Sequence, residues 1–166
     1  MKIAEFQKQV VFCVALTFVP FLASAQTAPE APVPAALIIA KKAFISNMGF
    51  EACARVAFST VKLSPYNMFY ASMRDWGHFD LVSAPADADV VFEIRMVAPG
   101  CGSGAAEFLL AAIDAKTHFV LWTINTPVPV AYRKETIQKN VGLAMSNLIN
   151  DLKKITSAPT PSSAHQ

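Results

Sequence analysis

The chain has 166 residues and a formal net charge of +2, which falls to +1 when the first 25 residues are left out. A charge this small excludes the basic footprint that is typical of proteins that bind nucleic acids or membrane surfaces. The remaining length is sufficient for one domain that folds without a metal or an oligomeric partner.

Residues 1–25 have the pattern of a secretory signal peptide. Lys2 and Lys8 precede an apolar stretch from Val10 to Leu22, and the small residues Ala23 to Ala25 follow it. A retained membrane anchor is disfavoured because the stretch is shorter than the ~20 residues of a spanning helix and contains Pro20. We therefore expect cleavage near Ala25, export to the periplasm or the cell exterior, and no transmembrane segment in the mature chain.

Pro-rich segments flank the predicted domain. Residues 26–35 form a Pro/Ala-rich spacer, and residues 157–166 form a disordered Pro/Ser/Ala tail. The sequence thus predicts a single folded domain at residues 36–156.

The first half of this domain contains one clear helix. Residues 36–48 are expected to form the first strand, and residues 50–63 a loop with at most one short helical turn. Ser64 and Pro65 begin a helix that ends at Gly77, because a hydroxyl cap, a first-turn proline and a C-terminal glycine are typical helix boundaries. Its apolar stripe consists of Tyr66, Phe69, Tyr70 and Met73.

The second half reads as strands followed by a helix. A short strand at residues 79–83 precedes strands at 90–97, 108–114 and 119–126. In the first of these three, Val90, Phe92, Ile94 and Met96 share the buried face, while Glu93 and Arg95 lie on the other. The strand at 108–114 is apolar on both faces at its start, which predicts some cover on each side. A polar turn at 114–118, opened by Asp114, joins the last two strands.

An amphipathic helix at residues 133–155 closes the domain, and covering the sheet is its simplest use. The predicted fold is therefore an α+β sandwich, in which a mixed sheet of about five strands carries two main helices. The expected order of elements is β-α-β-β-β-β-α.

Two stretches carry a resemblance to known proteins: Ala88 to Ile94, an Ala-Asp entry into a strand, and Asp114 to Trp122, an Asp-x-x-Thr hairpin. With the helices in matching order, the chain resembles small exported bacterial proteins of unknown function. More distantly, it is similar to the amino-terminal α/β domain of the periplasmic Tol-system protein and to related envelope assembly factors. The resemblance implies a five-stranded mixed sheet and an envelope location, with no catalytic residues to carry over. His118 stands where the distant relatives often have Gly, which leaves the type of turn open.

Cys53 and Cys101 remain after cleavage, and a disulfide between them is the default in an oxidising compartment. The bridge requires the strand that ends near Val97 to run parallel to the one that ends near Met48. Two inert thiols that miss each other, and a reactive Cys101 in its glycine loop, are the alternatives.

The search for catalytic motifs finds none, which favours a non-catalytic protein without a cofactor or a metal. One hypothesis is an exported binding or assembly module of the bacterial cell envelope, which contacts a protein partner through a sheet edge or its glycine loop. The alternative is a periplasmic protein that binds a small molecule or a metal at the aromatic helix near His78, with hydrolysis left open as its activity. The candidate contact residues are Tyr66, Tyr70, Trp76, His78, Gly100, Gly102 and Gly104.

Overall fold

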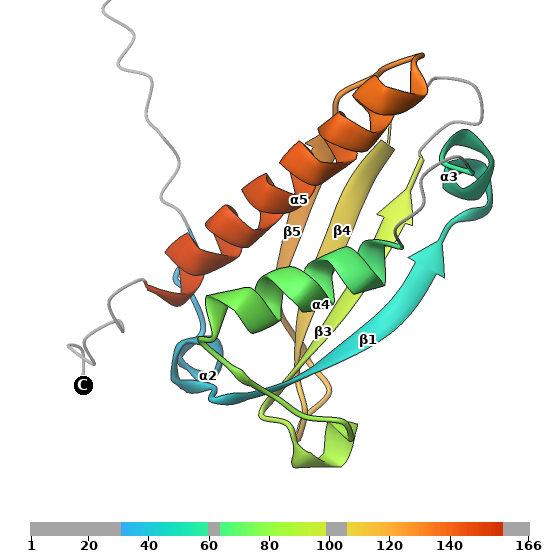
Figure 1. Ribbon diagram of the computed structural model, residues 1–166. Coiled ribbons are helices and arrows are strands. Elements are labelled where there is room, and N and C mark those ends of the chain that lie inside the picture. Colours follow the sequence, from blue (N-terminus) through green and yellow to red (C-terminus); the bar gives the residue numbers. More distant parts are fainter. Residues whose placement is uncertain (1–30, 60–63, 99–105, 158–166) are drawn as a thin grey trace, which may run out of the picture. The chain divides into compact units, whose positions relative to one another are not determined.

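The computed structural model describes residues 31–59, 64–98 and 106–157 of the chain. Figure 1 shows these residues as a sheet with helices packed on it, which confirms the expected α+β class. In chain order the elements are α2 (Ala35–Ile39), β1 (Lys42–Phe50), α3 (Ala52–Ala57), α4 (Pro65–Trp76), β2 (Asp80–Leu81), the 3-10 turn η1 (Pro85–Asp87), β3 (Val90–Val97), β4 (Ala106–Asp114), β5 (Val120–Val128) and α5 (Lys134–Thr156).

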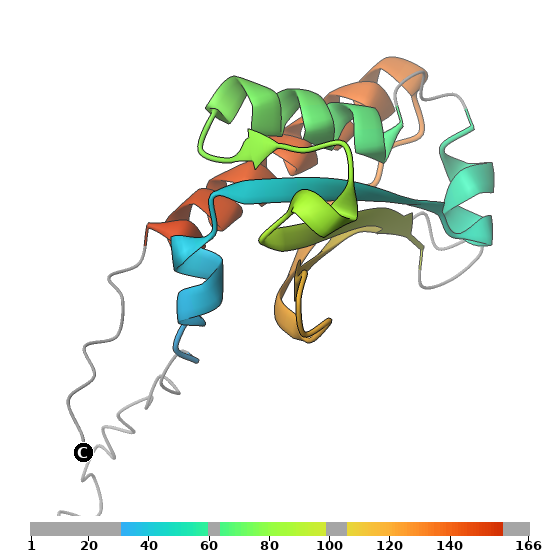
Figure 2. The ribbon, with the colours of Figure 1, turned by 90° about the horizontal axis from the view of Figure 1, so that it is seen from below.

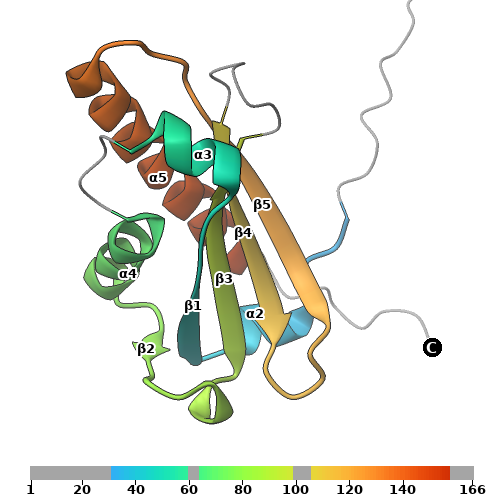
Figure 3. The ribbon, with the colours of Figure 1, turned by 90° about the vertical axis from the view of Figure 1, so that its right-hand side faces the viewer.

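The sheet has five strands in the order β2-β1-β3-β4-β5, which Figure 3 shows side by side. β1 pairs in parallel with both β2 and β3, whereas β3, β4 and β5 form an antiparallel meander. The sheet is therefore mixed, as expected from the sequence. Because β1 and β3 are parallel, their carboxyl ends lie at the same end of the sheet.

The core lies between the sheet and the helices α4 and α5. Figure 2 shows both helices on the same side of the sheet. The alternating side chains Val90, Phe92, Ile94 and Met96 of β3 are fully or almost fully buried, as predicted. From the helices, Phe69 and Met73 of α4 and a row of apolar residues of α5 complete this core; the latter are Val141, Ala144, Met145, Leu148, Ile149 and Leu152.

Local signals in the sequence correctly predict where α4 begins and ends. The Ser64 hydroxyl accepts a hydrogen bond from the backbone N–H of Asn67 at 3.1 Å, and Pro65 is the first helical residue. Gly77 ends the helix in the left-handed conformation, with φ at 65°, which is accessible to glycine at little cost. The predicted boundaries of this helix are therefore confirmed.

The start of the domain differs from the prediction. Residues 35–39 form the short helix α2 rather than the beginning of a strand, and β1 begins only at Lys42. Leu37 of α2 is completely buried in the same core as α5 and β4, so tertiary packing decides the conformation of this apolar segment. Within the strand the side chains alternate, because Ala43 and Ile45 are buried and Phe44 lies on the opposite face.

Two further boundaries shift. The segment expected to be a loop contains α3, a helix of six residues, before the chain leaves the described part at residue 60. β5 continues through Pro127 to Val128 instead of ending at residue 126. A proline is tolerated there because β5 is an edge strand, on which not every backbone N–H is needed for pairing.

Asp89 fixes the entry into the sheet. One of its carboxylate oxygens accepts hydrogen bonds from the backbone N–H groups of Lys41 and Lys42, both at 2.9 Å. The hydrogen bonds from Lys42 and Lys41 lower the pKa of the Asp89 carboxyl. The backbone of Asp89 also accepts a hydrogen bond from the N–H of Ala115 at 3.1 Å. This residue therefore ties the start of β1 and the end of β4 to the start of β3.

Asp114 opens the β4–β5 turn and stabilises it, as predicted. Its carboxylate accepts hydrogen bonds from the backbone N–H groups of Thr117 at 2.7 Å and of Lys116 at 2.9 Å. Hydrogen bonding by the backbone and then the hydroxyl of Thr117 lowers the pKa of the Asp114 carboxyl. His118 completes the turn in the left-handed region, with φ at 60°, where glycine is normally preferred.

Candidate binding surface

The side of the sheet opposite α4 and α5 is lined by half-buried and exposed side chains, and we call it the open face. No helix within residues 31–59, 64–98 and 106–157 packs over its middle, so the cover expected on both sides of β4 is absent there. Apolar residues from four strands lie on this face: Phe44, Met48, Val91, Leu109, Ile113 and Val120. Met48 and Val120 are 49% and 58% exposed. Exposed apolar side chains gathered on one sheet face are typical of a contact surface.

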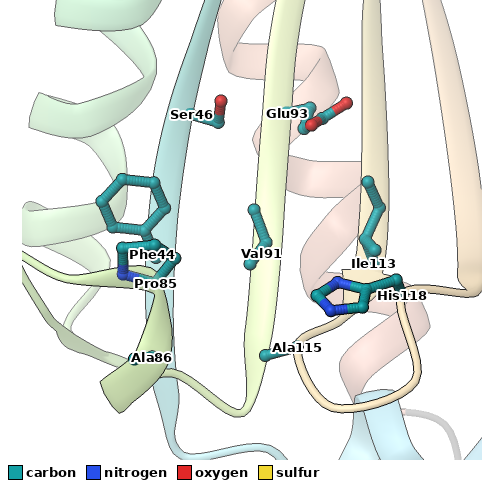
Figure 4. A pocket seen from close by; sticks show the side chains of 9 residues that line it. All are labelled: Phe44, Ser46, Pro85, Ala86, Val91, Glu93, Ile113, Ala115 and His118. Atoms are coloured by element: carbon teal, nitrogen blue, oxygen red, sulfur yellow. The ribbon is translucent and has the colours of Figure 1, made fainter.

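A hollow of about 700 Å³ occupies one end of the open face. Figure 4 shows Phe44 and Pro85 on one side of it, His118 on the other, and Val91 between them. The hollow is bounded at this end by η1 and by the β4–β5 turn, which the hydrogen bonds of Asp89 and Asp114 hold in place. Val91 and Ile113 make the middle of its floor apolar. The floor is rigid because its side chains come from paired strands.

The polar side chains of the hollow are not arranged for catalysis. Ser46 and Glu93 lie at one end and His118 at the other, with Val91 and Ile113 between them (Figure 4). Within the described residues no hydrogen bond joins these three side chains, and the Ser46 hydroxyl donates instead to the sulfur of Met48 at 3.9 Å. A serine nucleophile needs a base within hydrogen-bond reach, so the geometry favours binding over acyl transfer.

Two opposite charges lie in the middle of the open face. Glu93 and Arg95 are two residues apart on β3 and border a small hollow of about 120 Å³ with Met48, Leu109 and Ala111. Across the sheet, Glu93 is level with Ser46 and Ala111, and Arg95 with Gly49 and Leu109. None of these lateral neighbours is charged. The ion pairs found in the described part of the chain, Arg74 with Asp75 and Lys154 with Asp151, lie elsewhere.

Each long edge strand of the sheet contains one feature that weakens pairing with an added strand. On one side β2 covers only Lys42 and Ala43 of β1, and the next part of β1 is interrupted by a bulge. Gly49 has a positive φ there, and its N–H donates to the Asn47 side chain at 3.0 Å. On the other side Pro127 removes a donor from β5. Bulges and prolines of this kind discourage pairing at a sheet edge, so contact through the open face is favoured.

The aromatic side chains near the exit of α4 are largely packed against one another. The rings of Trp76 and His78 are stacked with centroids 4.8 Å apart, and both contact Phe79 edge-on. The Lys153 ammonium lies 5.5 Å from the centroid of the Trp76 ring, a cation–π distance. Burial, followed by the positive charge of Lys41, lowers the pKa of the His78 imidazole.

Tyr66 and Tyr70 lie on α4 with ring centroids 6.0 Å apart, and Tyr70 is 39% exposed. Neither tyrosine, nor Trp76 or His78, borders the hollows of the open face. The structure therefore keeps these four residues together at α4 and its exit, on the other side of the sheet from the open face. Their role as contact residues stays a prediction.

The remaining predicted site residues are two cysteines and three glycines. Cys53 is partly buried on α3, whereas Cys101 and the glycines Gly100, Gly102 and Gly104 lie outside the described residues. The geometric condition for a disulfide is met, because β1 and β3 run parallel. α3 is also tied to the end of β3, since the N–H of Glu51 donates to the carbonyl of Met96 at 2.9 Å. The disulfide itself stays a prediction.

A third hollow, which is polar and has a volume of about 590 Å³, lies between β5 and α5. It is lined by Asn125, Thr126, Pro127, Asn147, Asn150, Asp151 and Lys154. The Thr126 hydroxyl is buried, and it finds no hydrogen-bond partner among the described residues. In the same part of the chain, no cluster of three or more His, Cys, Asp or Glu side chains could hold a metal ion. Nor does any helix within it have the length and hydropathy needed to cross a membrane.

Sequence reasoning separated the two faces of β3 but did not identify the open face of the sheet. The alternation in β3 correctly put Glu93 and Arg95 on the less buried side. Phe44, Val91 and Ile113 were not recognised as contact candidates. The available signal was the presence of apolar residues at positions of the solvent face, in Phe44, Val91 and Leu109, where a solvated sheet normally has polar ones.

The fold and this surface define the class of the protein: an α+β sandwich with one helix-covered face and one open, partly apolar sheet face. The chain matches no known protein family and no curated protein.

Among solved structures, the chain is similar to PelC from Paraburkholderia phytofirmans, which forms a dodecamer in two crystal forms. One comparison, with a point variant of PelC, has 13% identity and a TM-score of 0.46, and covers 76% of this chain and 93% of that chain. The other has 14% identity and a TM-score of 0.45, and covers 79% and 96%. So distant a similarity carries no conclusion about what this chain binds or how it assembles.

Proposed function

We propose that the protein is an exported, non-catalytic binding or assembly module of the bacterial cell envelope. The observation that carries this proposal is the open face, where half-buried and exposed apolar side chains from four strands lie around Glu93 and Arg95. A protein surface of this kind is stabilised when a second protein surface removes it from water. The signal-peptide pattern of residues 1–25 supports the envelope as the place of action.

The arrangement of polar groups favours binding over catalysis. Ser46, Glu93 and His118 share a hollow but are separated by apolar side chains. The bulge in β1 and the proline in β5 weaken strand addition at those points of the sheet edges, which supports contact through the open face.

Site-specific photo-cross-linking in the bacterial host tests this function. A photoreactive amino acid is placed at Val120, on the open face, and in a control variant at Leu143, an exposed apolar residue of α5. We expect a defined protein adduct in the envelope fraction from position 120 and none from position 143. Equal cross-linking from both positions, or no adduct from position 120, would contradict the proposal.

The mass of the same purified protein tests export. A mature chain that begins near Gln26 is expected in the envelope fraction, because the signal peptide is removed during export. Full-length protein confined to the cytoplasm would exclude an envelope role.

A further inference from the structure

Glu93, Arg95 and the open-face residues Val91 and Val97 of β3 are arranged symmetrically about one level of the sheet. On β3, Glu93 and Arg95 lie on either side of Ile94, and Val91 and Val97 lie two residues further out. On β4, Leu110 is level with Ile94, so that Ala111 and Leu109 flank the same level. Opposite charges placed equally far from a centre meet one another across a two-fold interface, because residue i of one copy contacts residue j of the other and j contacts i.

We infer that the open face is a self-association surface on which a second copy of this chain packs sheet to sheet, with Glu93 of each copy paired with Arg95 of the other. This inference rests on the proposed function and names the partner of its binding surface. Two sheets packed face to face lie ~10 Å apart, and side chains from both inner faces interdigitate.

The symmetry follows from the strand register. A two-fold axis between the two sheets, running across the strands at the level of Ile94, makes the β3 strands of the two copies antiparallel. It brings each residue opposite the one equally far from Ile94 in the other direction. Glu93 then faces Arg95 of the second copy, and Val91 faces Val97. On β4, Ala111 faces Leu109 of the second copy.

Within one chain, no charged neighbour competes with the pairing of Glu93 and Arg95 across the two copies, as far as the described residues show. Glu93 and Arg95 have uncharged lateral neighbours on β1 and β4, and neither takes part in an ion pair in the described part of the chain. Two cross-copy pairs satisfy both charges of both copies at once. Like charges in the same positions would oppose the association, so the pairing also determines the antiparallel orientation.

The apolar residues supply the association energy around these charges. Met48, Val91, Leu109 and Ile113 surround Glu93 and Arg95 and lose their contact with water when a second sheet covers them. Glu107 is level with Val97 near the end of β4, so the two-fold axis places it opposite Ile113 of the second copy, at the margin of the interface. The pairs near the axis stay opposed even when the sheets cross at the usual ~30°.

Charge reversal tests the inference with the purified mature protein. Sedimentation equilibrium over a wide range of concentrations is expected to show a monomer–dimer equilibrium for the wild type. Glu93→Arg and Arg95→Glu each place like charges opposite one another, and each is expected to raise the dimer dissociation constant about tenfold or more. The control Glu135→Arg, which changes an exposed charge on α5, is expected to leave the dissociation constant unchanged.

Restoration distinguishes self-association from other effects of the mutations. An equimolar mixture of the two single variants is expected to form a heterodimer, because positions 93 and 95 are then both positive in one copy and both negative in the other. The double variant Glu93→Arg/Arg95→Glu is expected to dimerise like the wild type, and circular dichroism checks that every variant is folded.

The outcomes separate this inference from the proposed function. A wild type that stays monomeric at every concentration, or a dimer that neither reversal weakens, overturns the second-copy inference. The proposed function survives that result if position 120 still cross-links a different envelope protein. It fails separately if position 120 cross-links nothing.

Discussion

The hydrogen bonds of Asp89 predict a pH-dependent contribution to stability. A single carboxylate oxygen accepts two backbone N–H groups at 2.9 Å, at the point where β1 enters the sheet. Hydrogen bonds to a charged group contribute about 1.5–3 kcal/mol each when protected from water. Because Asp89 is exposed, solvent screening reduces the combined contribution to about 1–2 kcal/mol.

The perturbation is Asp89→Ala, with Asp89→Asn as the conservative variant. At pH 7 we expect the alanine variant to lose about 1–2 kcal/mol of unfolding free energy. The asparagine variant should lose about half of that, because its amide oxygen still accepts hydrogen bonds but carries no charge. The matched control is Asp87→Asn in η1, since the Asp87 side chain makes no hydrogen bond within the described residues.

The sign of the pH dependence follows from the lowered pKa of Asp89. The ionised carboxylate stabilises the folded state, so the contribution is complete above the unfolded pKa near 3.8 and is lost as the pH falls through the lower folded value. Urea denaturation followed by tryptophan fluorescence measures it at pH 7 and again at the lowest pH at which the protein stays folded. The difference between wild type and Asp89→Asn should be largest at pH 7 and shrink in acid. A difference that is constant with pH, or a loss equal to that of Asp87→Asn, would refute the reasoning.

Four further predictions concern single sites. His118→Gly should raise the free energy of unfolding by about 0.5–1 kcal/mol, because it relieves a left-handed φ of 60°; a loss in urea denaturation would contradict this. Thr126→Val removes a buried hydroxyl that finds no partner among the described residues, and a stabilisation of about 1 kcal/mol is expected in the same assay; a marked loss would show that the hydroxyl is bonded. Phe69→Ala should cost about 3–5 kcal/mol, since the side chain is completely buried, and a small loss would mean that the site collapses around the cavity. For the proposed disulfide between Cys53 and Cys101, peptide mapping of the exported protein should find the linked peptides, and iodoacetamide should modify both only after reduction; the bridge is expected to contribute about 4 kcal/mol. Modification of both cysteines without reduction would exclude it.

The site shows the limit of sequence reasoning most clearly. Alternation in β3 separated Glu93 and Arg95 from the buried residues correctly, and the neighbouring Val91 and Val97 were equally visible. The aromatic helix α4 was the contact region only of the alternative hypothesis, and Phe69 and Met73 of its stripe are buried in the core. Periodicity reports which residues share a face, but it does not report which segment of the chain covers that face.

Local chemistry in the sequence determined the elements whose ends carry strong signals. The Ser64-Pro65 start and the Gly77 end define α4, Asp114 opens the hairpin, and the alternation from Val90 to Met96 defines β3, because each depends on hydrogen bonds or side-chain spacing within a few residues. Tertiary structure alone decided the helical conformation of residues 35–39 and the insertion of β1 between β2 and β3. It also decided that both large helices cover one side of the sheet and leave the other open. Those features depend on contacts between residues far apart in the chain, whose free energy no local window of sequence contains.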